Sequence, residues 1–503
     1  FAINDQNKNI GVNAFSRYST VNNETTGHLD FNLGLKNIAS LTSFTYSNFA
    51  DLKGGTNQNP FYSGSYGERP YYVERINGQD SLVKNNDQYL QVQSSYSQID
   101  LLQKFLFRNN EHLSHGLNIQ YSNSSDIPRY DRLTDPSGTG LNYAQWYYGP
   151  QTRLFTAYDL NINNVASAFQ NIHLNLSYQN IKESRHTRKF GNDNLSHRNE
   201  NVNVFGTNLD FNKTYTSSNI RFGLDGQFNT LISTASIENI VNASDAPLDT
   251  RYPDGNNTML NSAIYFSHTL HINDKLILND GIRAGYVSLH STFVDTSFFN
   301  FPYTETTQNN PVFSGSIGLI YNPSEDWKLS LLLSTGYRVP NVDDLSKVFE
   351  SVPGTIIVPN ADPKPEQTFN YEAGVTKVIN QKTRWENTIF YTQFINAIVT
   401  DNFKFNGQDS ILYDGAMSQV MANQNKEKAY VYGFSSNLIS QFSKKFLLSF
   451  MMNYNYGRII TDSSDYPLDH IPPFMMKFQL SYSNNKFSSD FYINYNSWKR
   501  IED

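Results

Sequence analysis

The residues with the clearest capacity for ligand chemistry lie within 125–151. Residues 127–133 read Ile-Pro-Arg-Tyr-Asp-Arg-Leu, and aromatic side chains beside arginines can hold a flat, anionic macrocycle by stacking and charge-assisted hydrogen bonds. The alternative is that these residues only pack the loop against its neighbours, and the sequence favours neither interpretation. The candidate ligand-binding residues of this segment are Arg129, Tyr130, Arg132, Trp146, Tyr147 and Tyr148.

Two histidines form a second candidate site. His186 and His197 flank a predicted loop at 188–199, with Arg185, Arg188 and Lys189 nearby. This loop could meet an anionic ligand, although a solvated charged loop is the favoured interpretation. No Ser/His or Asp/His set that could form a catalytic site can be assigned, and the acidic clusters lack the spacing of a calcium loop. We therefore predict neither an enzyme nor a resident metal or cofactor.

The composition excludes several classes of protein. The 503 residues contain no cysteine, so disulfides and thiolate metal sites are excluded. The net charge is −7 and no basic stripe is visible, so nucleic acid is not an expected partner. With 33 Tyr and 35 Phe, the chain is too aromatic for a disordered segment. It contains no apolar run of about 18 residues, and a transmembrane helix is not expected.

Alternation of apolar and polar residues with a period of two dominates the chain. Leu29, Phe31 and Leu33 share one face of a predicted strand, while Asp30 takes the other. About 19 such segments follow one another without an amphipathic helix, which fits a large membrane barrel better than a soluble sandwich. The residues expected to face lipid also include Ile220, Phe222, Phe491 and Ile493, and those expected to face the lumen include Arg221, Asp225, Asp490 and Asn494.

The predicted connections alternate between short and long. Short turns near 36–37, 109–114 and 212–217 alternate with long loops near 51–87, 126–151 and 239–257. Outer-membrane barrels likewise have short periplasmic turns and long extracellular loops. Two predicted strands, 89–107 and 276–294, exceed the about 9–11 residues of a bilayer crossing and should project beyond the outer leaflet. The predicted fold class is all-β, a transmembrane antiparallel barrel.

A stretch around residue 340 carries a more specific signal. YRVPN at 337–341 ends one predicted strand, PNADPKPE follows at 359–366, and NYEAG at 370–374 opens the next strand. These pieces resemble the FRAP, NPDLKPE and E-x-G signature of TonB-dependent outer-membrane receptors, with departures at Tyr337, Val339, Ala361 and Pro363. The residues that carry the resemblance are Tyr337, Arg338, Pro340, Asn360, Asp362, Lys364, Pro365, Glu366 and Glu372.

Further motifs follow in the same order as in that family, and the resemblance covers 330–475. The last of them, PLDHIPP at 467–473, ends in Pro472 and Pro473. The role expected for these motifs is mainly structural, because a proline fixes φ and removes a hydrogen-bond donor from a strand ladder. Arg338 is expected to pair with Asp343, Asp344 or Glu366, and ligand contact is the alternative.

The resemblance implies a barrel of 22 strands when complete. Residues 1–503 would be the barrel domain, with the plug domain and the last strands absent from this sequence. It also implies a place in the outer membrane of a Gram-negative bacterial cell, surrounded by lipid and lipopolysaccharide. The implied function is active import of a scarce, large ligand, an iron–siderophore or haem, driven by the TonB system through the plug region. The alternatives are a cobalamin importer and a structural barrel subunit of a surface or secretion complex.

The identity of the ligand stays open at this point. Haem receptors that resemble this chain usually carry a histidine between the FRAP and NPDL elements, and a histidine nitrogen can bind haem iron. Residues 341–359 contain no His, Met, Cys or Tyr. If haem is the ligand, its iron must therefore be bound by another side chain, with Tyr130, Tyr147, His186 and His197 as candidates. Otherwise the ligand is held by stacking and charge alone.

Overall fold

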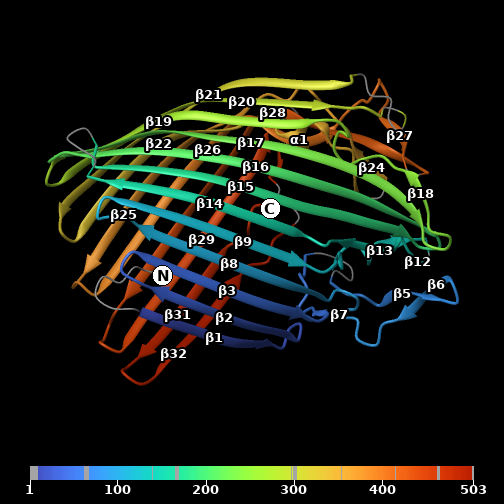
Figure 1. Cartoon of the computed structure of the whole chain (residues 1–503), viewed down its shortest axis with the longest axis horizontal. Coiled ribbons are helices and arrows are strands. Elements are labelled where there is room, and N and C mark those ends of the chain that lie inside the picture. The colour runs from blue at the N-terminus through green and yellow to red at the C-terminus, as the bar shows by residue number, and fades with distance from the viewer. Residues whose placement is uncertain are drawn as a thin grey trace.

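The long strands form a single antiparallel meander. The computed structural model describes residues 9–61, 67–138, 140–164, 169–295, 297, 303–352, 354–413, 415–460, 465–468 and 470–500. Within these residues, 19 strands of nine or more residues each pair with the next in chain order (Figure 1). They are β1 (Asn9–Ser19), β2 (Glu24–Gly34), β3 (Ile38–Phe49), β8 (Tyr96–Arg108), β9 (Leu113–Ser124), β14 (Thr152–Asn163), β15 (Asn171–Lys189), β16 (Asn194–Thr214), β17 (Ser218–Asn239), β19 (Asn257–Asn273), β20 (Leu276–Thr292), β21 (Glu305–Ser324), β22 (Trp327–Arg338), β25 (Glu366–Ile379), β26 (Thr383–Asn402), β28 (Ala416–Ser440), β29 (Phe446–Ile460), β31 (Met475–Ser483) and β32 (Ser488–Asn496).

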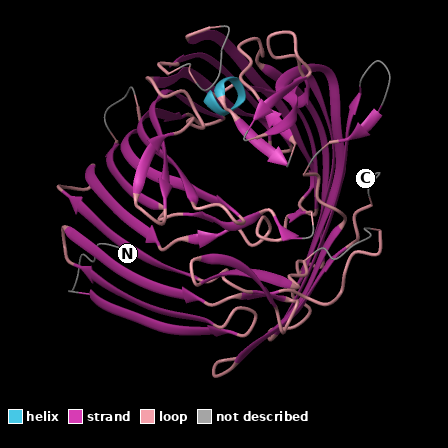
Figure 2. Cartoon of the chain, turned by 90° about the vertical axis from the view of Figure 1, so that its right-hand side faces the viewer, coloured by secondary structure: helices cyan, strands magenta, loops and turns pink. Residues whose placement is uncertain are grey.

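The sheet curls round on itself, as the end-on view in Figure 2 shows. Each strand is tied to its neighbours by a continuous register, such as the 21 pairs that join Asn194–Thr214 of β16 to the facing stretch of β17. In the described part of the chain, no ladder joins β1 to β32. The all-β antiparallel barrel architecture that the sequence predicted is confirmed. The total of 22 strands stays a prediction.

The two faces of the sheet differ in the way a membrane barrel requires. Leu29 and Phe31 of β2 are exposed, whereas Asp30 between them is half-buried and hydrogen-bonded to Asn13. A soluble protein would bury such apolar rows, but in a barrel they face lipid. Large apolar side chains exposed on outward faces recur around the sheet, for example Phe44, Leu101, Leu117, Phe205, Phe222, Leu224, Ile264, Ile282, Phe491 and Ile493.

The inward face carries polar networks. The guanidinium of Arg283 donates two hydrogen bonds to Asp225, one of them 2.7 Å long, and a third to the Tyr337 hydroxyl at 3.3 Å. Arg221 pairs with Asp210 at 2.8 Å. The lumen-facing positions predicted for Arg221 and Asp225 are therefore confirmed. Fixed hydrogen-bond partners keep such charged side chains in the polar interior.

The connections alternate between short turns at one rim and, apart from the turns 20–23 and 190–193, longer loops at the other, as predicted. The loop-bearing rim lies at the right-hand end of Figure 1 and faces the viewer in Figure 2. The elements in its loops are β4 (Leu52–Lys53), β5 (Tyr71–Ile76), β6 (Gln79–Lys84), β7 (Leu90–Gln91), β10 (Ile127–Pro128), β11 (Pro136–Ser137), β12 (Gly140–Leu141), β13 (Tyr143–Tyr148), β18 (Ser244–Pro247), α1 (Val342–Ser346), β23 (Phe349–Val352), β24 (Thr355–Ile357), β27 (Ser410–Tyr413) and β30 (Asp465–Pro467).

Two predictions about this rim were wrong. The strand expected at 89–107 is split, because β7 ends at Gln91 and β8 begins at Tyr96 after a break that contains Gln93 with a φ of 64°. The loop expected at 188–199 is only the turn 190–193, since β15 and β16 stay paired almost to their tips. His197 consequently lies in a strand, where its side chain has a fixed direction.

The described residues contain no helix long and apolar enough to cross a membrane. The helix α1 spans only five residues. It is held by a capping box, in which the Asn341 side chain accepts a hydrogen bond from the Asp344 backbone and the Asp344 side chain accepts one from Asn341. Such a box satisfies backbone donors at a helix start. It fixes the chain where β22 leaves the sheet.

Candidate ligand-binding site

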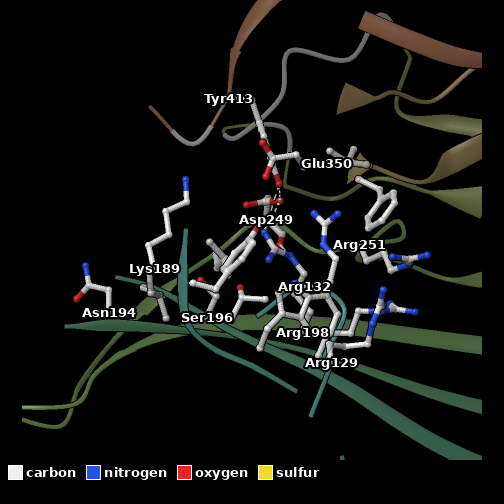
Figure 3. Close-up of a pocket in the computed structure, with 18 of the residues that line it drawn as sticks. Arg129, Arg132, Lys189, Asn194, Ser196, Arg198, Asp249, Arg251, Glu350 and Tyr413 are labelled. Atoms are coloured by element: carbon white, nitrogen blue, oxygen red, sulfur yellow. Dashed lines mark hydrogen bonds and ion pairs between the residues drawn. The ribbon is translucent and has the colours of Figure 1, made fainter. Parts of the chain in front are cut away.

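A cavity of about 380 Å³ lies at the loop-bearing rim on the lumen side of the wall (Figure 3). Its lining comes from β13, β15, β16 and β17, from the loops around Arg129 and Asp249, and from β23 and β27. Basic and aromatic side chains dominate the lining, which consists of Arg129, Arg132, Tyr143, Trp146, Arg185, Thr187, Lys189, Asn192, Asn194, Ser196, Arg198, Ile237, Leu248, Asp249, Arg251, Val348, Phe349, Glu350, Ser351 and Tyr413.

The alternation of the two tall strands decides which residues reach this cavity. Arg185, Thr187 and Lys189 share one face of β15, because successive side chains of a strand point to opposite sides. Arg198 of β16 stands directly opposite Arg185 in the register and lines the same cavity. Two guanidiniums are thus held side by side on a rigid wall.

Arg129 lies among aromatic rings. Its guanidinium carbon is 4.8 Å from the ring centre of Trp146 and 5.3 Å from that of Tyr148. It donates to both carboxylate oxygens of Asp131, at 2.8 and 2.6 Å, and to the Tyr148 hydroxyl at 2.5 Å. The Asp131 carboxylate raises the pKa of Arg129, so its charge is fixed. The structure therefore brings three sequence candidates, Arg129, Trp146 and Tyr148, into one cluster.

Arg132 also lines the cavity. It pairs with Asp135 at 3.2 Å and donates to the Ser351 carbonyl at 3.4 Å, which connects the 125–151 loop to β23. Tyr130 lies outside the lining and is 43% exposed. Tyr130 therefore faces solvent, although Arg129 and Arg132 on either side of it line the cavity.

The remaining candidates, Tyr147, His186 and His197, lie on the opposite side of the wall. Tyr147 pairs with His186 in the register and its ring stacks on the imidazole at 4.7 Å. Tyr147, His186 and His197 are each out of phase with an adjacent cavity residue, which is Trp146, Arg185 and Arg198 respectively. Tyr147 instead lines another space, of about 640 Å³, between the β5–β6 hairpin and the wall, and Trp146 lines both this space and the rim cavity.

Both histidines are engaged in hydrogen bonds. The two Nδ1 atoms of His186 and His197 are 2.6 Å apart, His186 Nε2 lies 3.0 Å from the Gly149 carbonyl, and His197 Nε2 lies 3.2 Å from Glu238. Burial, reinforced by the neighbouring His197, lowers the pKa of His186. Within the part of the chain that the structure describes, no group of three or more His, Cys, Asp or Glu could hold a metal ion.

Sequence reasoning missed several lining residues that come from distant loops. Arg198 bonds Asp249 at 2.9 Å, and the Tyr413 hydroxyl lies 3.2 Å from the same carboxylate. Arg251 lies over the Phe349 ring, with its guanidinium carbon 4.7 Å from the ring centre. The phase of β16 relative to β15 could have indicated Arg198. Nothing local in the sequence places Asp249, Arg251 or Tyr413.

The motif around residue 340 forms a network of structural contacts beside the cavity. Arg338 pairs with Asp344 at 2.6 Å, one of the three partners expected for it. Asn360 donates to the Asn423 carbonyl at 2.8 Å and so joins the loop to β28. Pro340 is fully buried where β22 ends.

Other motif residues hold neighbouring strands together. Glu366 accepts a hydrogen bond from the Ile398 backbone at 2.9 Å, and the Lys364 backbone donates to Asn425 at 2.7 Å. Glu372 of β25 pairs with Leu332 and Phe390 in the sheet. Tyr337 accepts a hydrogen bond from Arg283 in the lumen, and the other motif residues, Asp362, Pro365, Pro472 and Pro473, lie in or next to loops. None of the motif residues lines the rim cavity.

Together these features define a transmembrane β-barrel with a polar inner face and a ligand-sized cavity at its loop-bearing rim. The sequence model of the family described as TonB dependent receptor-like, beta-barrel matches residues 103–500, and the chain belongs to that family. Its members are receptors and transporters of the bacterial outer membrane rather than enzymes, and this chain is an outer-membrane protein.

Individual relatives are more distant. Over 215 residues the chain is 26% identical to the probable hemoglobin and hemoglobin-haptoglobin-binding protein 4 of Haemophilus influenzae, a match that covers 41% of this chain and 21% of that protein. The chain thus spans about a fifth of this curated relative.

Three solved structures share the fold. The copper transporter OprC superposes with a TM-score of 0.73 at 14% identity, covering 97% of this chain and 66% of that one. The hemophore receptor HasR of Serratia marcescens, solved with its hemophore HasA and heme, gives a TM-score of 0.67 at 12% identity, covering 97% and 72%. The ferric yersiniabactin uptake receptor FyuA of Yersinia pestis gives 0.64 at 12% identity, covering 96% and 68%.

Proposed function

We propose that this chain is the barrel of a TonB-dependent importer, and that the rim cavity binds an anionic iron chelate or haem. The observation that carries the proposal is the lining of that cavity. Five arginines and Lys189 line it, against the carboxylates of Asp249 and Glu350, and two of these arginines, Arg129 and Arg132, are also paired with Asp131 and Asp135 outside the lining. Such an excess of positive charge complements an anionic ligand, and guanidiniums bind carboxylate or catecholate oxygens in bidentate fashion.

Hydrogen-bond donors remain available in the lining. Arg185 Nη1 and Arg251 Nε are buried without a hydrogen-bond partner among the described residues. An unpaired buried donor costs about 1–3 kcal/mol, so a ligand oxygen that satisfies either atom gains that much in binding. Trp146 and Phe349 supply ring faces for the apolar part of the ligand.

The names of the relatives support the same class of ligand. Three of the four names reported refer to hemoglobin, to a heme-carrying hemophore and to ferric yersiniabactin, whereas OprC is a copper transporter. Energy for import would come from the TonB system through a plug region, and both are proposed partners of the complete protein. No observation favours cobalamin or a purely structural barrel, and these two remain alternatives for the test.

The cavity also restricts how haem iron could be held. The described lining contains Tyr143 and Tyr413 but no histidine. His186 and His197 lie on the other side of the wall, and a half-buried imidazole with both nitrogens engaged is a poor ligand for incoming iron. We therefore favour a ligand held by charge and stacking rather than by a histidine–iron bond.

The test titrates the complete receptor with haemin, ferric siderophores and cyanocobalamin in turn, with binding followed by tryptophan fluorescence. Arg185→Gln should weaken binding of the recognised ligand by about tenfold to a hundredfold, since a hydrogen bond to a charged group contributes about 1.5–3 kcal/mol. His186→Ala is the matched control, because it changes the adjacent residue on the opposite face and should leave binding unaltered.

Three results would count against the proposal. Loss of haemin binding in His186→Ala with no effect of Arg185→Gln would move the site to the outer face. Tight cobalamin binding without any response to iron ligands would leave only the importer assignment. Absence of binding by every small ligand would favour the structural barrel subunit.

A further inference from the structure

A second cavity, of about 270 Å³, adjoins the first along β15. Arg185 lines both cavities, and the second one extends from there past Glu183 to Ile181, toward the membrane-spanning part of the strand. It faces the same lumen side of the wall, because these residues are in phase on β15. A ligand seated at the rim would have this inner cavity directly beneath it.

The inner cavity presents hydrogen-bond acceptors that have no donors. Glu200 of β16 is only 7% exposed, and neither of its carboxylate oxygens has a hydrogen-bond partner. Its nearest cation is Arg185, whose Nη1 lies 3.7 Å away, beyond hydrogen-bond distance. Asn257 is 2% exposed, and its Oδ1 is also unpaired although its amide nitrogen bonds the Pro253 carbonyl at 2.8 Å.

Buried acceptors without donors are costly, and a carboxylate more so than an amide. Burial accordingly raises the pKa of Glu200. A native structure that keeps two such groups in one cavity is complementary to a ligand group that brings N–H donors. The remaining charges reinforce this polarity, since Glu183 and Asp343 also line the cavity and Arg185 is its only guanidinium among the described residues.

The carboxylates other than Glu200 are already occupied. Asp343 accepts hydrogen bonds from Lys347 at 2.7 Å and from the Tyr252 hydroxyl at 2.9 Å. Glu183 accepts one from Arg185 at 3.2 Å. Glu200 is thus the carboxylate of this cavity whose oxygens accept no hydrogen bond, and it lies at the boundary with the arginine-rich outer cavity.

We propose that the inner cavity binds a primary ammonium or similar N–H donor arm of the ligand whose anionic chelate occupies the outer cavity. Glu200 accepts a charge-assisted hydrogen bond from the arm and Asn257 accepts a second. This inference rests on the proposed function and narrows its substrate class to a chelate with both an anionic head and an amine. Haem carries no such arm and would leave Glu200 unpaired.

The test compares two probes that differ in one group. A ferric tris-catecholate with one primary amine arm is titrated against the complete receptor, beside the same chelate with that amine acetylated. The unmodified receptor should bind the amine form at least about tenfold more tightly, as a charge-assisted hydrogen bond implies. In Glu200→Gln this ratio should fall to about one, with little change in affinity for the acetylated form.

The control variant is Glu238→Gln. This carboxylate lies on the outer face of β17 beside His197, and its removal should preserve the preference for the amine. In Glu200→Gln, Arg185 keeps its hydrogen bond to Glu183, and a neutral amide costs less to bury than a carboxylate, so the test variant is expected to fold.

The outcomes distinguish failure of the amine site in the inner cavity from failure of the proposed function of the rim cavity. Equal affinity for both chelates in the unmodified receptor, or a preference that survives in Glu200→Gln, overturns the inference and leaves the proposed function standing. Binding of haemin with neither catecholate bound has the same consequence. If haemin and both catecholates all fail to bind, the proposed function and the inference fall together.

Discussion

An arginine placed at Leu224 should destabilise the barrel strongly. Leu224 lies on the outward face of β17, is 42% exposed, and pairs with Ile264 of β19 in the apolar belt. From Ser218, where the strand leaves the short turn, six residues at ~3.3 Å each advance ~20 Å along the strand. At a tilt of 35–45° this is about 15 Å along the membrane normal, close to the middle of a belt about 25 Å tall.

At that depth Leu224→Arg should lower the free energy of unfolding by about 2–4 kcal/mol. Gln227→Arg is the control, because Gln227 belongs to the inward face of the same strand and should change stability by less than about 0.5 kcal/mol. Urea unfolding in lipid vesicles, followed by far-UV circular dichroism, measures both. If the two variants lose equal stability, or Gln227→Arg loses more, the assignment of the faces of β17 is wrong.

The other predictions concern a close contact, an ion pair and the pore. An alanine at Gly223 would drive its Cβ into the Leu209 carbonyl oxygen, so Gly223→Ala should cost about 1–3 kcal/mol in the same unfolding assay. Gly27→Ala, whose Cβ meets nothing within 4 Å, should leave the free energy of unfolding nearly unchanged. Burial opposes ionisation of Asp80, but hydrogen bonds from Arg188 and the Gly191 backbone outweigh it and lower its pKa. The ion pair between Asp80 and Arg188 should therefore persist at every pH above the carboxyl pKa of the unfolded chain, about 3.9, and be lost only as the pH falls through the lower pKa of the folded state. Proteolysis of the β5–β6 hairpin that already increased at pH 5 would contradict this. If the complete receptor contains the proposed plug, single-channel recording in planar bilayers should show a closed channel, and a large constitutive conductance would indicate a porin instead.

The wall of the barrel could be predicted from the sequence because the alternation of side chains along a strand depends only on neighbouring residues. A strand alternates faces with a period of two, so Leu29 and Asp30 are separated by the backbone alone, whatever lies elsewhere. The pairing of Arg338 with Asp344 could be predicted for a similar reason. The two residues are six positions apart in sequence, where a strand ends at a proline and a capped turn follows, so they stay close in space.

The cavity was only partly predictable. The 125–151 loop supplied Arg129, Arg132 and Trp146 because aromatic and basic residues are dense there. Asp249 and Arg251 reach the site from a loop with no periodicity, and their positions follow from how loops fold over one another. The opposite directions of Arg185 and His186 were within reach of the alternation rule. The direction of His197 was not, because this residue fell inside the loop predicted at 188–199, whereas β16 already begins at Asn194.

The wall between Arg185 and His186 is one backbone thick, and this limits how the receptor can change. Inserting or deleting a single residue in the upper half of β15 would turn every later side chain through the wall, exposing His186 and Arg188 to the lumen and withdrawing Arg185 and Lys189. Length changes are therefore tolerable in steps of two, or within the turn 190–193, where no side-chain phase is at stake. New ligand preferences in this part of the rim should arise by substitution at alternate positions, while the lengths of the two tall strands stay constant.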